Sequence, residues 1–203
     1  MTPPPDPARR DDVPQLILAS GSPYRAELLS RLGLPFAQSS PDIDERPHEG
    51  ESPRDYVRRL AAAKARAVSA PPPALVIGSD QAAVLDGRIL GKPGSRANAI
   101  SQLEAAAGRT VRFLTGLCLR DAASGRERTD VVVYSVTFRP LSRERIERYV
   151  DADMPFDCAG SFKAEALGIT LFQHMAGDDP TALVGLPLIR LVDFLTDAGI
   201  RLP

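Results

Sequence analysis

The chain has 203 residues, of which 25% are charged and 43% are hydrophobic, a balance that provides a substantial core and excludes an intrinsically disordered protein. The 25 Lys and Arg residues against 26 Asp and Glu residues give a net charge of -1, whereas non-specific nucleic-acid-binding proteins carry a basic excess. Two cysteines and two histidines, scattered along the chain, provide neither a disulfide framework nor the ligand spacing of a zinc site.

The start of the chain is not predicted to be a signal peptide. Residues 1–14 are rich in Pro and Asp, lack the apolar segment of a signal peptide, and predict a disordered leader before one domain over 15–203. No apolar stretch approaches the ~20 residues that a membrane-spanning helix requires. We therefore expect a reduced, cytoplasmic protein that binds neither membranes nor nucleic acid.

The first half of the chain is predicted to alternate strands and helices. Short apolar runs indicate buried strands, and a Ser-Pro pair, with Ser at the N-cap and Pro at the first helical position, marks the start of each helix. The expected elements are a strand at 16–19, a helix at 22–33, a strand within 34–40, a helix at 52–69 and a strand at 75–77 that ends at Gly78.

The second half is predicted to contain antiparallel hairpins and three more helices. Asp86-Gly87 is a strong turn dipeptide and predicts a hairpin over 83–90. The other expected elements are helices at 95–107, 142–150 and 188–198, long paired strands at 111–120 and 128–139, and a strand at 168–174 inside the loop-rich segment 151–185. Together they predict an α/β fold, with a mixed twisted sheet and flanking helices in two lobes.

Polar residues follow three predicted strand ends, at 20–25, 78–81 and 91–93. Strand ends followed by helix N-termini are where α/β sheets commonly bind ligands. In the first segment, the N–H groups of a helix start and the guanidinium of Arg25 offer an anion site. A capped helix with a surface arginine is the commoner structure for such a segment taken alone.

Other charged residues could complete a site for phosphate chemistry. Asp80 closes an apolar strand, where its carboxylate could hold a divalent metal, accept a proton from water or simply form an Asx turn. Lys64 among alanines and Lys92 in 91–93 could reach phosphates or remain solvated, and the acidic loop 42–45 could bind Mg²⁺ or remain solvated. Jointly, these groups are what a metal-dependent phosphate-transfer site needs.

Cys158 and His174 could be considered as a nucleophile and its base. Cys158 stands beside Phe156 and Ala159, without the sequence context of a catalytic cysteine. We therefore expect a buried structural thiol.

The ordered set of motifs resembles the Maf-like family from about residue 15 to the C-terminus. The matching segments are 16–20, 22–25, 42–45, 63–65, 78–81, 91–93, 115–116 and 184–187. The resemblance implies a two-lobed α/β fold with the nucleotide in the intervening cleft, and a homodimer. It also implies a nucleoside triphosphate pyrophosphatase, which hydrolyses the α–β phosphoanhydride of modified nucleotides with a divalent metal, Mg²⁺ or Mn²⁺.

Site residues follow from the resemblance position by position. Asp80 falls on the family's proton acceptor, and it and Glu45 are the candidate metal ligands. The positions along the phosphate path are Ser20, Arg25, Lys64 and Lys92. A metal and fixed cations would neutralise the phosphates while the base orients water.

One departure from the family pattern concerns the base. Many members have two arginines after Ser-Pro, whereas this chain has Tyr24 in place of the first arginine. Tyr24, together with Gln81 and Glu165, resembles the branch of the family that acts on 7-methyl-GTP. The resemblance implies that these three residues select the substrate. Because N7-methylation leaves guanine cationic, an aromatic face would attract it and an arginine would repel it. Glu165 could accept from the guanine N1–H and N2–H₂ edge. Helix packing for Tyr24 and a surface acid for Glu165 are the alternatives.

Two other functions remain open at this point. One is a dTTP/UTP pyrophosphatase of the same family, and the other is a non-catalytic nucleotide-binding regulator of septum formation. The complete set of Asp80, Arg25, Lys64 and Lys92 favours an enzyme over a regulator.

Overall fold

The computed structural model describes residues 14–202, so the predicted leader lies, except for Pro14, outside the described residues. The strands are β1 (Gln15–Ala19), β2 (Phe36–Ser39), β3 (Ala74–Leu85), β4 (Arg88–Leu90), β5 (Thr110–Asp121), β6 (Glu127–Phe138) and β7 (Phe172–Ala176). The α-helices are α1 (Pro23–Ser30), α2 (Pro53–Ala67), α3 (Arg96–Ala106), α4 (Arg143–Asp153), α5 (Thr181–Val184) and α6 (Leu188–Asp197). No helix of residues 14–202 is long and apolar enough to span a bilayer.

The strands form one seven-stranded mixed sheet, in the order β2-β1-β3-β5-β6-β7 with β4 beside β3. β1 runs parallel to β2 and β3, and the other pairs are antiparallel. β1 pairs with β3 as far as Gly78, and β4 pairs with β3 from Ala83 onwards. Within the described residues, the edge of β3 between these points, 79–82, faces no strand on that side. We call this stretch the open edge.

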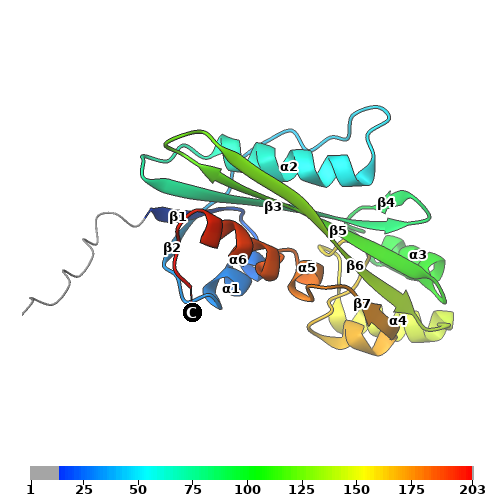
Figure 1. The fold of residues 1–203 in the computed structure, drawn as a ribbon. Coiled ribbons are helices and arrows are strands. Elements are labelled where there is room, and N and C mark those ends of the chain that lie inside the picture. The colour runs from blue at the N-terminus through cyan, green and yellow to red at the C-terminus, as the bar shows by residue number, and fades with distance from the viewer. Residues whose placement is uncertain (1–13, 203) are drawn as a thin grey trace, which may run out of the picture.

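Helices cover both faces of the sheet (Figure 1). Alternate β3 residues face opposite sides, so Val76 packs against α2, whereas Ile77 packs in a cluster with α1 and α6. Further along the same strand, Leu85 belongs to a cluster with α3 and α4 that contains four phenylalanines in edge-to-face contact. The last two clusters are the cores of two lobes that share one sheet, and the open edge lies between them.

Two strand glycines let α2 lie directly against the sheet. A Cβ added at Gly78 would be 2.1 Å from the carbonyl oxygen of Ala61, and one at Gly116 would be 2.2 Å from that of Val57. Both oxygens belong to the α2 backbone, which cannot move aside as a flexible side chain would. The glycines therefore set the distance from α2, which carries Lys64, to β3, which carries Asp80.

Replacing Gly116 by Ala is expected to lower the free energy of unfolding by about 1–3 kcal/mol, because the added methyl overpacks the contact between α2 and the sheet. Chemical denaturation measures the change. Gly91→Ala is the matched control, since a Cβ there meets nothing within 4 Å. A Gly116→Ala protein as stable as the wild type would contradict this close packing.

Most predicted elements are confirmed, and Ser22, Ser52 and Ser142 each accept the expected N-cap hydrogen bond. The predicted end of the strand at Gly78 is wrong, because β3 continues to Leu85 along an unbroken ladder with β5. The polar segment 78–81 is therefore part of the strand rather than a loop.

The segment 151–185 also differs from the prediction. A 3₁₀ turn occupies Leu167–Leu171, and the strand begins only at Phe172, where pairing with β6 starts. The short helix α5 was not predicted at all.

Candidate active site

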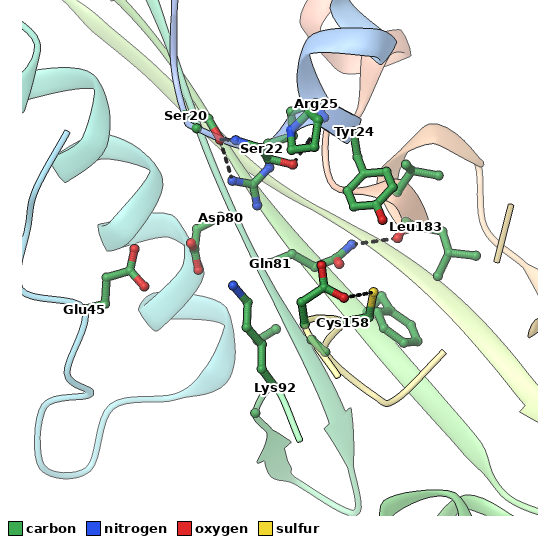
Figure 2. A pocket seen from close by; sticks show the side chains of 18 of the residues that line it. Ser20, Ser22, Tyr24, Arg25, Glu45, Asp80, Gln81, Lys92, Cys158 and Leu183 are labelled. Atoms are coloured by element: carbon green, nitrogen blue, oxygen red, sulfur yellow. Dashed lines mark hydrogen bonds between the residues drawn. The ribbon is translucent and has the colours of Figure 1, made fainter. Parts of the chain in front are cut away.

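A cleft of about 740 Å³ opens at the open edge of β3 (Figure 2). Its walls come from the end of β1, the start of α1, the loop after β2, the loop after β4, the segment 157–165 and α5. All nine site residues that the family resemblance implies line it: Ser20, Tyr24, Arg25, Glu45, Lys64, Asp80, Gln81, Lys92 and Glu165. The structure thus brings together residues that are spread over 146 sequence positions, from 20 to 165 inclusive.

Lys64 bridges two carboxylates at the wall formed by α2. Its Nζ lies 2.5 Å from Asp80 Oδ1 and 2.7 Å from Glu45 Oε1, and both Lys64 and Asp80 are more than 90% buried. Within residues 14–202, the hydrogen bond from Lys64 occupies one of the two Asp80 oxygens. The ammonium therefore fixes the carboxylate while its second oxygen can accept a hydrogen bond from water.

The remainder of the acidic loop does not reach the cleft. Asp44 forms an exposed ion pair with Arg46 at 2.6 Å, and neither Asp42 nor Asp44 lines the cleft. Of this loop, Glu45 alone supplies a carboxylate to the site among the described residues. Lys92, from the loop after β4, is exposed and directs its ammonium toward the cleft in Figure 2.

Arg25 is a half-buried cation held by neutral oxygens. Its Nε donates to the Gly185 carbonyl at 2.8 Å, and its Nη1 donates to Ser20 Oγ at 3.2 Å. Burial lowers the pKa of the guanidinium, an effect opposed by the negative charges of Asp80 and Glu45. Among the described residues no carboxylate forms an ion pair with Arg25. A half-buried guanidinium without a carboxylate partner can take an anionic ligand, and the N-terminus of α1 beside it favours one too.

Gln81 lies at the opposite end, with its amide orientation fixed by acceptors. Its Nε2 donates to the carbonyls of Ala182 at 2.7 Å and Leu183 at 3.1 Å, and to Thr115 Oγ1 at 3.0 Å. The Thr115 hydroxyl itself donates to Ala182, so it can only accept from Gln81. The amide oxygen of Gln81 is therefore left as an acceptor for a ligand.

Tyr24 stands near several acidic groups at this end. Burial raises the pKa of its phenol most, and the negative charges of Asp157, Glu165 and Asp153 raise it further. The phenol is therefore neutral at physiological pH. The cleft consequently has cations at one end and an aromatic ring with carboxylates at the other.

Cys158 and Asp157 also line the cleft. Burial and the neighbouring Asp157 raise the pKa of the Cys158 thiol to about 12, so the sulfur is a neutral thiol and a poor nucleophile. The expected structural thiol is half-exposed rather than buried in the core, and His174 lies on β7 outside the cleft. The sequence does not predict Asp157 as a cleft residue. The only available signal is its position directly before Cys158, a residue considered above as a nucleophile.

Comparisons with known proteins indicate the family to which the chain belongs. Residues 15–198 match the protein family described as Maf-like protein. The 7-methyl-GTP pyrophosphatase of Pseudomonas aeruginosa is 58% identical over 192 residues, which cover 94% of this chain and 100% of that protein. The 7-methyl-GTP pyrophosphatase of Nitrosococcus oceani is 57% identical over 187 residues, which cover 92% of this chain and 94% of that protein. Among solved structures, a HAM1 protein from Coxiella burnetii has a similar fold (TM-score 0.52, 17% identity, covering 91% of this chain and 100% of that one).

Proposed function

The chain belongs to the Maf-like protein family, and we propose from this premise that it hydrolyses 7-methyl-GTP to 7-methyl-GMP and pyrophosphate. The observation that carries the proposal is the polarity of the single cleft described above. One end has a half-buried arginine that pairs with no carboxylate of residues 14–202, and the other has Tyr24 among acidic groups. A ligand with an anionic tail and a cationic aromatic head matches both ends.

The phosphate end is suited to hold a triphosphate. Arg25 offers a fork of N–H donors, Lys92 an exposed ammonium, and Ser20 together with the backbone N–H of Tyr24 further polar contacts. Because the Arg25 guanidinium is held by Gly185 and Ser20 before the substrate arrives, it can stabilise the charge that develops on the phosphates without reorganising.

Asp80 is the proposed base. It precedes Gln81 in β3, so a nucleotide whose base lies near Gln81 has its first phosphate nearest Asp80. The free carboxylate oxygen accepts a proton from water as the water oxygen bonds to the α-phosphorus. The bond from that phosphorus to the bridging oxygen breaks, and its electron pair leaves with pyrophosphate. Lys64 holds the carboxylate in place throughout.

A divalent cation fits the donor set at this point of the cleft. No group of three His, Cys, Asp or Glu side chains suited to a metal occurs within 14–202. Mg²⁺ is commonly held by one or two carboxylates together with substrate phosphates. Lys64 contacts one oxygen of Glu45 and one of Asp80, so the second oxygen of each carboxylate is left for a cation. We propose that these two residues hold Mg²⁺ or Mn²⁺, which would neutralise phosphate charge when bound.

Base selection is assigned to the other end. The Tyr24 ring would contact the cationic face of 7-methylguanine. The oxygen of Gln81 and the carboxylate of Glu165 are acceptors for the N–H groups on the edge of the base. We further propose a homodimer in the cytoplasm, as the family resemblance implies.

Tyr24→Arg is expected to lower the preference for 7-methyl-GTP over UTP by about tenfold, since cation–π attraction of about 1–2 kcal/mol is replaced by charge repulsion. The ratio of kcat/KM for the two substrates measures the effect. Tyr24→Phe keeps the ring and should retain most of the preference. An unchanged kcat/KM ratio in Tyr24→Arg would contradict this account of base recognition.

A substrate panel tests the proposed function. Pyrophosphate release from 7-methyl-GTP, GTP, dTTP and UTP by the purified chain should give the highest kcat/KM for 7-methyl-GTP. Preference for dTTP and UTP would instead assign the other branch of the family. Tight binding of nucleotides with no turnover of any of them would favour a regulatory protein.

A further inference from the structure

The short helix α5 and the turn after it hold side chains from both ends of the cleft. The carbonyls of Ala182 and Leu183 accept from Gln81, at the base end, and the carbonyl of Gly185 accepts from Arg25, at the phosphate end. All three acceptor carbonyls belong to the four residues of α5 and the glycine that follows them. Both ends of the cleft thus take their orientation from one short segment.

The same carbonyls are also tied to the sheet. The Thr115 hydroxyl donates to the carbonyl of Ala182 at 2.8 Å, and Ser79 Oγ lies 2.9 Å from the carbonyl of Gly185. Gly185 has a φ of 112°, and a Cβ there would lie 3.3 Å from Arg25 Nε. Glycine at this position therefore permits the left-handed turn and the close approach of Arg25.

Asp179 fixes this segment from outside the cleft. It is 3% exposed, its Oδ1 accepts from the backbone and hydroxyl of Thr181 at 2.9 and 2.5 Å, and its Oδ2 accepts from the backbone of Ile189 at 2.8 Å. Thr181 Oγ1 in turn accepts from the backbone of Leu188 at 2.8 Å. The carboxylate therefore joins the start of α5 to the amino end of α6, where negative charge is favourable.

We propose that Asp179 is a positioning residue for the reaction, a role that rests on the proposed function. It locks α5 to α6, whose Leu191 and Leu195 are fully buried in one lobe. The carbonyls of α5 then set the direction of the Arg25 guanidinium and of the Gln81 amide together. Asp179 thus governs turnover through Arg25 and base preference through Gln81, without touching the substrate.

Asp179→Asn tests this role. The amide nitrogen of Asn cannot accept a hydrogen bond, so one of the bonds to Thr181 or Ile189 is lost and the carbonyls shift. We expect kcat/KM for 7-methyl-GTP to fall about 100-fold, as small misplacements of catalytic groups do. The preference over UTP should shrink as well, which loss of stability alone would not cause. Both are measured at a temperature where circular dichroism shows the variant folded.

Asp121→Asn is the matched control. Asp121 also closes a turn, accepting from the backbone of Ala123 and the hydroxyl of Ser124 between β5 and β6, outside the cleft. The Asp121→Asn protein should have the wild-type kcat/KM and the wild-type preference for 7-methyl-GTP over UTP. An Asp179→Asn protein that is folded and keeps both the wild-type rate and the wild-type preference would overturn the proposal.

A second pair of variants decides the matter if Asp179→Asn does not fold. Thr181→Ser keeps the hydroxyl that links Asp179 to Leu188 and should keep the base preference, whereas Thr181→Val removes it and should lose preference. Equal preferences in both would contradict the role. If the wild type prefers a nucleotide other than 7-methyl-GTP, the proposed function fails. The same variants, measured on that nucleotide, then still decide whether Asp179 positions Arg25 and Gln81.

Discussion

Replacing Asp80 by Asn is expected to lower kcat for 7-methyl-GTP about 10³-fold, within the range that a general base contributes. The amide has nearly the shape of the carboxylate, and its oxygen can still accept from Lys64, so the wall of the cleft stays in place. What is lost is the group that takes the proton from water. Pyrophosphate release under saturating substrate measures kcat, and KM should change much less than kcat.

Asp44→Asn serves as the control for this substitution. Asp44 is adjacent to Glu45 in sequence but forms an exposed pair with Arg46 outside the cleft. Its removal should leave kcat at the wild-type value. Hydrolysis at the wild-type rate by Asp80→Asn would remove Asp80 from the role of base.

Substituting Arg25 with Lys is the second change with a large expected effect. Lysine keeps the charge, but a single ammonium cannot donate to Gly185, Ser20 and a phosphate with the planar fork of arginine. We expect kcat/KM to fall about 10²-fold or more, comparable to the loss of one donor that stabilises transition-state charge.

Arg31→Lys, just beyond the end of α1, is the comparison that isolates this effect. Arg31 is exposed and pairs with Glu27, so its substitution should change neither rate nor affinity. Steady-state kinetics on both variants give the answer. If Arg25→Lys were as active as Arg31→Lys, the Arg25 guanidinium would not serve the phosphates.

Local signals in the sequence were sufficient for most of the fold. A Ser-Pro pair places an N-cap and the first helical turn within a few residues, and Asp86-Gly87 defines the hairpin of β3 and β4 without help from elsewhere. The length of β3 is not a local property, because the ladder with β5 carries the strand through its polar segment. Helix α5 has only four residues, too few for a periodic apolar pattern, and no N-cap side chain. Neither signal of a helix is therefore present in its sequence.

The candidate site was predictable as a set of residues but not as an arrangement. Each of Arg25, Lys64 and Asp80 alone has a plain structural interpretation, and the family resemblance joined them. Their orientation depends on partners that are distant in sequence: Arg25 on a carbonyl 160 positions away and Gln81 on carbonyls 101 and 102 positions away. Asp179 was missed for the same reason, since its effect on the cleft passes through backbone groups.

The most direct test of the account is hydrolysis of 7-methyl-GTP in water enriched in heavy oxygen, followed by mass spectrometry of the products. The proposed attack of water on the α-phosphorus, with Asp80 as the base, predicts that the label appears in 7-methyl-GMP and is absent from pyrophosphate. Label in pyrophosphate, or products that are 7-methyl-GDP and labelled inorganic phosphate, would contradict the assignment of the cleft.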